Sequence, residues 1–118
     1  MRDKAFPRSA RLLAALDFKR VFADPERSKD EYFTILALRT GRPASRLGLA
    51  ISKKQIRRAV DRNRLKRLVR ESFRHHRKQL DGLDLVVMAR MAAGLADNVR
   101  LNLSLAEHMR KLISDSVR

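Results

Sequence analysis

Residues 61–73, "DRNRLKRLVRESF", combine a helical repeat of apolar side chains with a dense run of Arg and Lys. Successive residues lie about 100° apart around an α-helix, so the apolar side chains here and just beyond gather in one arc roughly 140° wide. The members of this arc are Leu65, Leu68, Val69, Ser72, Phe73 and His76. Such an arc can pack on a sheet, and the segment therefore predicts a helix with one side in the core.

The other side of this helix carries positive charge. Its residues, which fall between about 100° and 200° from Leu65, are Asn63, Lys66, Arg67, Arg70, Arg74 and Arg77, with Arg62 and Arg64 flanking them. Surface helices ordinarily mix charges of both signs, whereas Glu71 is the only acid between Arg62 and Gln79. Guanidinium groups bind phosphate oxygens through planar forks. The stripe therefore indicates a nucleic-acid backbone as the partner, and it would suit duplex DNA as well as RNA.

The composition favours the same class of partner. The chain has 118 residues, which suits a single domain over residues 1–118, and its formal net charge of +15 is best explained by a polyanionic partner. There is no cysteine, which excludes a disulfide scaffold and a Cys-based zinc site. No apolar run approaches the roughly 18 residues of a membrane span. We expect a cytoplasmic protein without a signal peptide; a cationic membrane-surface protein is the alternative.

The rest of the chain completes the predicted fold. Strands are predicted at residues 31–39, 46–54 and 84–90. Helices are predicted at residues 17–23, with Asp17 as the cap, and at about 98–115. The second strand is expected to pair with the first across the turn "TGRPAS". The order α-β-β-α-β-α predicts the α+β class, as a two-layer α-β sandwich.

Side chains along the first predicted strand alternate between the two faces of the sheet. The two rows are Phe33, Ile35 and Ala37, and Tyr32, Thr34 and Leu36. If helices cover one face only, the other is a partly aromatic platform on which single-stranded bases could stack. Phe18 and Phe22, four residues apart on the first helix, would either line the edge of this platform or fill the core. Their spacing fits both roles.

Catalytic groups are hard to find in this sequence. A protein nuclease usually needs clustered carboxylates for metal ions or a placed acid–base pair. The acids here are dispersed over an apparent loop and a turn, at Asp24, Glu26, Asp30, Glu31, Asp81 and Asp84. His75 and His76 would diverge by about 100° on a helix, and His108 is a lone surface candidate. We therefore expect no catalytic residue and no metal site in this chain alone.

Three segments together resemble the protein component of bacterial ribonuclease P. They are "FPRSARLLAALDFKRVF" at residues 6–22, "RLGLAISKK" at residues 46–54 and "AVDRNRLKRLVRESFR" at residues 59–74. The last contains the Arg-Asn-Arg motif that is central to this family, followed by Lys-Arg and a further Arg. The order and spacing of the segments also match, and the resemblance extends from about Phe6 to Leu112.

The resemblance implies a fold and a function that composition does not. The fold would be an α-β sandwich with a left-handed βαβ crossover, shared with a ribosomal-protein domain. The holoenzyme of this family is an endonuclease that removes the 5′ leader of precursor tRNA by Mg²⁺-dependent hydrolysis. Its catalytic centre lies in the RNA subunit, and the protein subunit helps to bind the leader and supports metal binding by the RNA. A catalytic RNA and precursor tRNA are therefore the implied partners, with Mg²⁺ held in the RNA subunit.

The resemblance also assigns residues to two surfaces. The motif helix would face the catalytic RNA through Arg62, Asn63, Arg64, Lys66, Arg67 and Arg70, and the charge stripe adds Arg74. The leader cleft, between the first helix and the open sheet face, would contain Phe18, Phe22, Thr34, Leu36, Lys53 and Lys54. Some family members carry an aromatic residue at the position of Leu36, and Tyr32 is a candidate to replace it. A ribosomal or general RNA-binding protein, or a DNA-binding module, remains the competing hypothesis.

Overall fold

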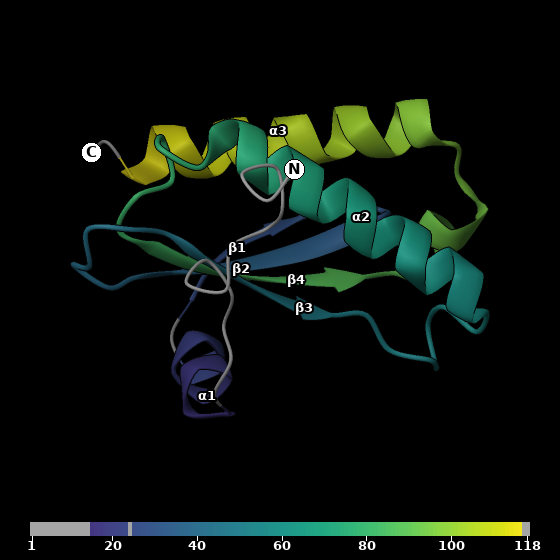
Figure 1. The fold of residues 1–118 in the computed structure, drawn as a ribbon, viewed down its shortest axis with the longest axis horizontal. Coiled ribbons are helices and arrows are strands. Elements are labelled where there is room, and N and C mark those ends of the chain that lie inside the picture. The colour runs from purple at the N-terminus through teal and green to yellow at the C-terminus, as the bar shows by residue number, and fades with distance from the viewer. Residues whose placement is uncertain (1–14, 24, 117–118) are drawn as a thin grey trace, which may run out of the picture.

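A four-stranded sheet lies at the centre of the protein, with two long helices on one face and a short helix on the other (Figure 1). The computed structural model describes residues 15–23 and 25–116. In chain order the elements are α1 (Ala15–Ala23), β1 (Glu26–Lys29), β2 (Phe33–Arg39), β3 (Arg46–Ala50), α2 (Ala59–His76), β4 (Leu83–Ala89), the 3₁₀-helix η3 (Met91–Leu95) and α3 (Asn98–Ser116). The predicted α+β class and the three helices are confirmed.

The main core lies between the sheet and the helices α2 and α3. Leu65, Val69 and Phe73 of α2 are fully buried there, as the helical arc predicts. They meet the row of Phe33, Ile35 and Ala37 from β2, and α3 adds Leu101, Leu105, Met109 and Leu112. The periodicity of α2 and the alternation of β2 therefore identified their inner faces correctly. Among the described residues, no helix is both long and apolar enough to span a membrane.

The order of the strands differs from the expected one. The sheet has the order β1-β2-β4-β3, so β4 lies between β2 and β3 and pairs parallel with β3. The expectation that residues 46–54 pair with residues 31–39 is wrong. Almost every side chain of β4 is buried, because a central strand is covered on both faces. Arg46 also binds the buried Asp84 of β4, with Nε to Oδ1 at 3.0 Å and Nη2 to Oδ2 at 2.7 Å.

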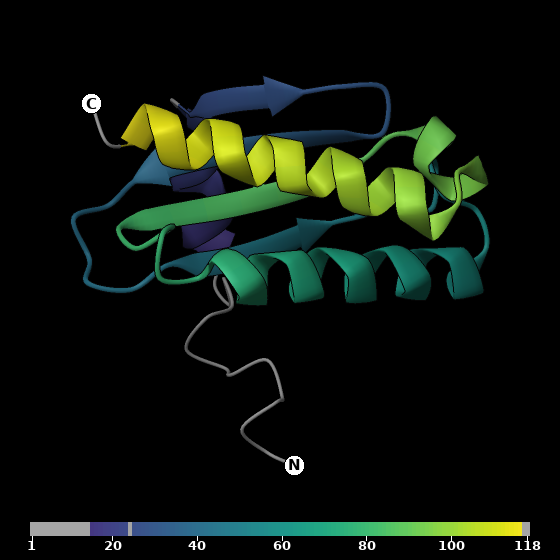
Figure 2. The same ribbon diagram turned by 90° about the horizontal axis from the view of Figure 1, so that it is seen from above.

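The connection from β3 through α2 to β4 is a left-handed crossover. Figure 2 views the sheet from the side of α2 and α3, and the chain leaves β3 toward the viewer, returns along α2 and enters β4 next to β3. Nearly all βαβ units have the opposite hand. The crossover implied by the family resemblance is therefore present.

The segment expected to be a loop before β2 contains the edge strand β1. Its residues pair antiparallel with β2, from Glu26 opposite Ala37 to Lys29 opposite Thr34. Their side chains are polar and mostly exposed, so neither hydrophobic alternation nor β-branched residues marked the strand. Helix α1 is described from Ala15, which places Asp17 inside the helix and not at its cap. Asp24 and the residues before Ala15 lie outside the described residues.

A polar cluster joins α3 to the edge of the sheet. His108 is only 4% exposed, so the prediction of a surface histidine is wrong. Its Nδ1 lies 2.6 Å from Ser28 Oγ of β1, and its Nε2 lies 3.1 Å from Asp30 Oδ2. Asp30 also accepts hydrogen bonds from Ser104 Oγ of α3 and from the backbone N–H groups of Tyr32 and Phe33. Burial acts to raise the pKa of Asp30, but these hydrogen bonds and His108 outweigh it, and the pKa lies below its ordinary value.

Candidate nucleic-acid interface

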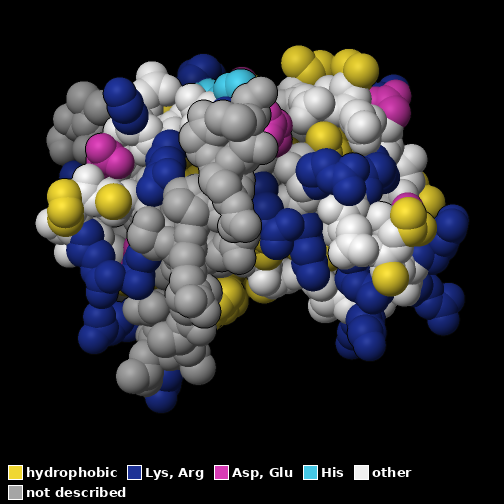
Figure 3. Space-filling model, in the orientation of Figure 1, with side chains coloured by type: hydrophobic (Ala, Val, Ile, Leu, Met, Phe, Trp, Pro, Cys, Tyr) yellow, Lys and Arg dark blue, Asp and Glu magenta, His cyan; other side chains and the backbone are white. Residues whose placement is uncertain are grey.

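The outer face of α2 is strongly basic and is presented on a rigid support. Figure 3 shows Lys and Arg side chains over the front of the molecule, where α2 lies, with few acidic side chains among them. The three buried anchors of this helix fix its rotation against the sheet. The predicted stripe therefore lies on one surface, but its members do not all have the same contacts.

Two arginines of the motif are engaged by the protein itself. Arg62 Nη1 donates hydrogen bonds to the backbone oxygens of Ile56, at 3.0 Å, and Arg57, at 2.8 Å. Arg64 Nη1 donates to Asn98 Oδ1 at 2.7 Å, and its Nη2 donates to the Ala96 oxygen at 3.3 Å. These bonds fasten α2 to the preceding loop and to the start of α3. The positions of Arg62 and Arg64 therefore support the shape of the surface as well as its charge.

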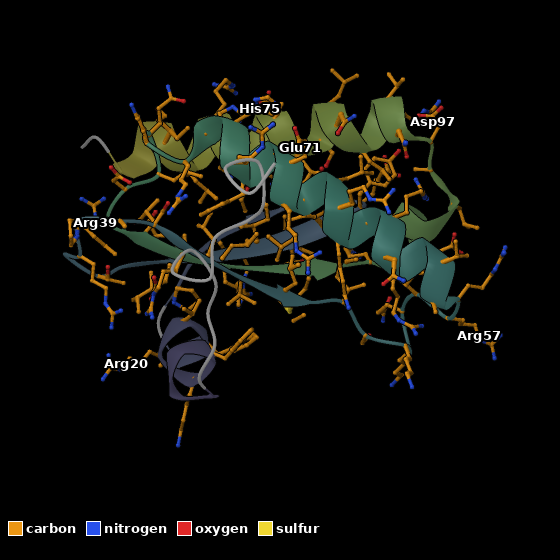
Figure 4. All side chains as sticks on the ribbon, viewed as in Figure 1. Arg20, Arg39, Arg57, Glu71, His75 and Asp97 are labelled. Atoms are coloured by element: carbon orange, nitrogen blue, oxygen red, sulfur yellow. The ribbon has the colours of Figure 1, made fainter. Side chains whose placement is uncertain are left out.

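The C-terminal end of the stripe is partly neutralised. Arg74 forms an ion pair with Glu71, and His75 Nε2 lies 3.3 Å from the same carboxylate. Figure 4 shows Glu71 and His75 together on the outer side of α2. The hydrogen bond from Arg74 is the main reason why the pKa of Glu71 is lowered. Arg74 lies on the stripe, as predicted, but a phosphate would have to compete with Glu71 for it.

The middle of the stripe offers the most accessible groups. Asn63 and Arg67 are exposed and Lys66 is half-exposed, as is Arg70. Within residues 15–23 and 25–116, Lys66 and Arg67 have no ion pair. A cation without a protein partner can bind an incoming phosphate without first losing an internal contact. Lys66 and Arg67, with the amide of Asn63 beside them, therefore form the centre of the candidate interface.

The second face of the sheet carries α1. Val21 is fully buried against Leu36 and Val86, and Phe18 packs at the edge of this small cluster. Phe22 is 48% exposed. The two phenylalanines thus differ: Phe18 contributes to packing, whereas Phe22 presents about half of its side chain to solvent. The sequence left core and platform roles equally open, and it did not single out Val21 as the anchor of α1.

Two residues assigned to the leader cleft are placed differently by the structure. Leu36 is on the expected face but only 1% exposed, because α1 covers it. Tyr32 precedes β2 and packs against the main core on the opposite face. Its side chain also hydrogen-bonds Arg100 of α3, which raises the pKa of that guanidinium. The expectation that Tyr32 shares a face with Thr34 and Leu36 is therefore wrong, because the Asp30 turn redirects the chain just before the strand.

The part of the second face beside α1 is a short row across three strands. Thr34 of β2 lies opposite Met88 of β4, which lies beside Ala50 of β3. All three are half-buried. Met88 and Ala50 were not among the predicted site residues, although strand alternation in β3 and β4 could have suggested them. Lys53 and Lys54 are exposed in the loop that follows β3, at the end of the sheet away from α1 in both views (Figures 1 and 2).

Metal-binding groups are not gathered in the described part of the chain, and the cluster of Ser28, Asp30 and His108 joins α3 to the edge of the sheet, away from the outer face of α2. No three His, Asp or Glu side chains there are placed to hold a metal ion together. His76 Nδ1 lies 2.9 Å from the Ser72 carbonyl oxygen, to which it donates. The arrangement as a whole supplies cations, an amide and an exposed aromatic ring, which are binding groups for a nucleic acid.

Comparisons with known proteins identify the family of this chain. The model of the Ribonuclease P family matches residues 6–113. The ribonuclease P protein component of Thioalkalivibrio sulfidiphilus is 49% identical over 110 residues, covering 93% of this chain and 92% of that relative. The component of Methylococcus capsulatus is 52% identical over 103 residues, covering 87% of this chain and 80% of that relative.

Solved structures resemble the fold over a similar range. The RNase P protein of Staphylococcus aureus superimposes with a TM-score of 0.78 at 30% identity, covering 87% of this chain and 94% of that chain. The RNase P protein of Thermotoga maritima gives a TM-score of 0.75 at 31% identity, covering 86% of this chain and 96% of that chain. Because the family model matches residues 6–113, which is nearly the whole chain, the chain belongs to the ribonuclease P protein family.

Proposed function

We propose that this chain is the protein subunit of a ribonucleoprotein endonuclease that removes the 5′ leader of precursor tRNA in the cytoplasm. Its main partner is the catalytic RNA, bound by the outer face of α2. The observation that carries this proposal is the accessible group of Asn63, Lys66 and Arg67 on a helix anchored by three buried side chains. A rigid helix presents these groups at fixed spacing, so little ordering entropy is lost when phosphates bind.

The single-stranded leader binds on the second face of the sheet. Phe22 offers a half-exposed ring at one side of this face, and Thr34, Met88 and Ala50 continue it across the strands. Bases stack on aromatic rings whatever their sequence, which suits a subunit that must accept many leaders. In this arrangement Leu36 supports α1 from below and does not contact the leader.

The hydrolytic chemistry belongs to the RNA subunit. An activated water and stabilisation of the leaving oxygen would come from Mg²⁺ held by that RNA. The contribution of this chain is electrostatic: a basic α2 beside the RNA offsets phosphate repulsion where RNA and substrate meet. The chain raises the local stability of the assembled site and provides no acid or base of its own.

Reconstitution tests this function directly. The purified chain is added to a bacterial catalytic RNA, and cleavage of precursor tRNA is followed at a low Mg²⁺ concentration. We expect cleavage to rise with added chain until one protein is bound per RNA, and we expect no cleavage by the chain alone. Binding to the RNA without any effect on cleavage would instead favour a general RNA-binding protein. Cleavage in proportion to protein, with no RNA subunit present, would contradict the assignment of the chemistry.

A further inference from the structure

A hollow at the N-terminal end of α2 has no role in the function described so far. Its volume is about 280 Å³, and it lies between the loop after β3, the first turn of α2 and η3. The lining residues are Gln55, Ile56, Arg57, Arg58, Asp61, Met91, Gly94 and Leu95. Small-molecule sites typically have volumes of about 300–1,000 Å³, so this loop–η3 hollow, just below that range, has room for one small group.

The walls of the loop–η3 hollow are apolar and exposed. Leu95 is 88% exposed and Met91 is 62% exposed, and both line the same hollow, so they form a contiguous apolar patch of the kind that marks an interaction site. Ile56, by contrast, is almost fully buried and forms the floor. Gly94 keeps this floor open, because a Cβ atom there would lie 3.3 Å from Ile56 Cδ1. Apolar walls of this kind favour an occupant with a flat apolar face.

The rim of the same hollow is cationic. Arg57 and Arg58 are both exposed, and Figure 4 shows Arg57 pointing outward at this end of the molecule. The only acid of the lining is Asp61, which lies 4.0 Å from Arg58. An occupant therefore needs an apolar face and negative charge nearby, and a nucleotide has both. A second copy of the chain fits poorly, because two molecules of net charge +15 repel each other.

Both walls are held in place before any partner binds. Arg62 of α2 holds the loop through the backbone oxygens of Ile56 and Arg57. On the other side, the backbone N–H of Met91 donates to Gln55 Oε1 at 3.1 Å. A site whose walls are already fixed loses less entropy on binding. The first arginine of the motif is thus a positioning residue for this hollow.

We propose that the loop–η3 hollow binds a single unstacked nucleobase of the catalytic RNA, with Arg57 and Arg58 on the phosphates beside it. This inference rests on the proposed function, since it takes that RNA as the partner. The hollow lies at the N-terminal end of α2, so the same RNA could cover both the hollow and the charge stripe. It would add a contact that depends on shape to a surface that otherwise recognises charge.

A matched pair of variants tests the proposal. Leu95→Ala removes a wall of the hollow, and Leu103→Ala makes the same truncation at an exposed position of α3 (67% exposed) outside the lining. Both side chains are largely exposed, so both variants should melt like the unaltered protein. We expect Leu95→Ala to weaken binding of the RNA subunit roughly tenfold, because the base loses the apolar area that it buries against Leu95, and Leu103→Ala to leave it unchanged.

Chemical footprinting of the RNA in the assembled holoenzyme gives a second measurement. One unpaired nucleotide should be protected by the unaltered chain and by Leu103→Ala, and should become reactive again with Leu95→Ala. Equal affinities and identical footprints for the two variants would overturn the proposal while leaving the function intact, provided the unaltered chain still stimulates cleavage. If Leu95→Ala changed only the sedimentation of the free protein, the hollow would be an interface between copies, and the proposal would again be wrong. Failure of the unaltered chain to bind the RNA would instead count against the proposed function.

Discussion

Replacing Phe22 by alanine separates leader binding from folding. The side chain is 48% exposed, so only about half of it contributes to packing. Full burial of a large apolar side chain is worth about 1.5–3 kcal/mol, and truncation should therefore cost about 1 kcal/mol of the free energy of unfolding. For a chain of this size the melting temperature should fall by about 3–6 °C. The variant should remain folded at the temperature of a binding assay.

The effect on binding should be larger and selective. A base stacked on an aromatic ring contributes about 1–3 kcal/mol, which corresponds to a loss of affinity of roughly 5- to 140-fold. The assay compares the Kd of the reconstituted holoenzyme for precursor tRNA with its Kd for mature tRNA, at one salt concentration. Mature tRNA has no leader, so its Kd should not change.

Two further variants serve as controls for Phe22→Ala. Phe22→Leu keeps an apolar side chain but removes the flat ring, so it should melt nearly like the unaltered protein and still lose precursor affinity. Val21→Ala truncates the buried neighbour, so it should lower the melting temperature more than Phe22→Ala and affect both tRNAs alike. If Phe22→Ala, still folded, weakens precursor and mature tRNA equally, Phe22 does not contact the leader and the assignment of the second face fails there.

Three other predictions concern α2 and the polar cluster. Arg67→Ala should leave the melting temperature unchanged but reduce the slope of log Kd against log salt for the RNA subunit by about one contact; an unchanged slope would remove Arg67 from the phosphate contacts. Arg62→Ala should lower the free energy of unfolding by about 1–2 kcal/mol in denaturant titrations, because two carbonyls lose a charged donor; unaltered stability would mean that these bonds are not needed. The pKa of Asp30 is lower in the folded chain than its unfolded value of 3.8, so the ionised carboxylate stabilises the fold fully at pH values above 3.8. This stabilisation is lost as the pH falls through the lower, folded pKa. Melts from pH 6 to pH 2 should therefore depend less on pH for Asp30→Asn, and parallel curves would contradict this linkage.

Local periodicity was sufficient for the parts of the fold that depend on near neighbours. The spacing of Leu65, Val69 and Phe73 identified the buried side of α2, and alternation in β2 identified the row that begins at Phe33. Both patterns follow from backbone geometry within one element. They also placed Lys66 and Arg67 on the outer side of α2, so the centre of the candidate interface could be predicted from the sequence.

The contacts of individual site residues could not be predicted in this way. Arg62, Arg64 and Arg67 have the same charge and lie on one helix, yet the first two bind backbone or side-chain oxygens of the protein. Whether a cation meets such an acceptor depends on which loop passes it in space. For the same reason Phe22 is half-exposed while its neighbour Val21 is buried, since only the docking of α1 on the sheet distinguishes them.

The sequence by itself determined the class of the protein, its basic surface and the inner face of α2, because these depend on composition and on spacing along the chain. The tertiary structure alone decided that β4 lies between β2 and β3 and that β1 forms one edge of the sheet. It also decided that Tyr32 packs against the main core and not on the face that carries α1. Strand order is a choice among distant pairings, and it is decided by which arrangement buries both faces of β4 and pairs Arg46 with Asp84. Such contacts join residues far apart in the chain, and they stabilise the protein only once the whole sheet has formed.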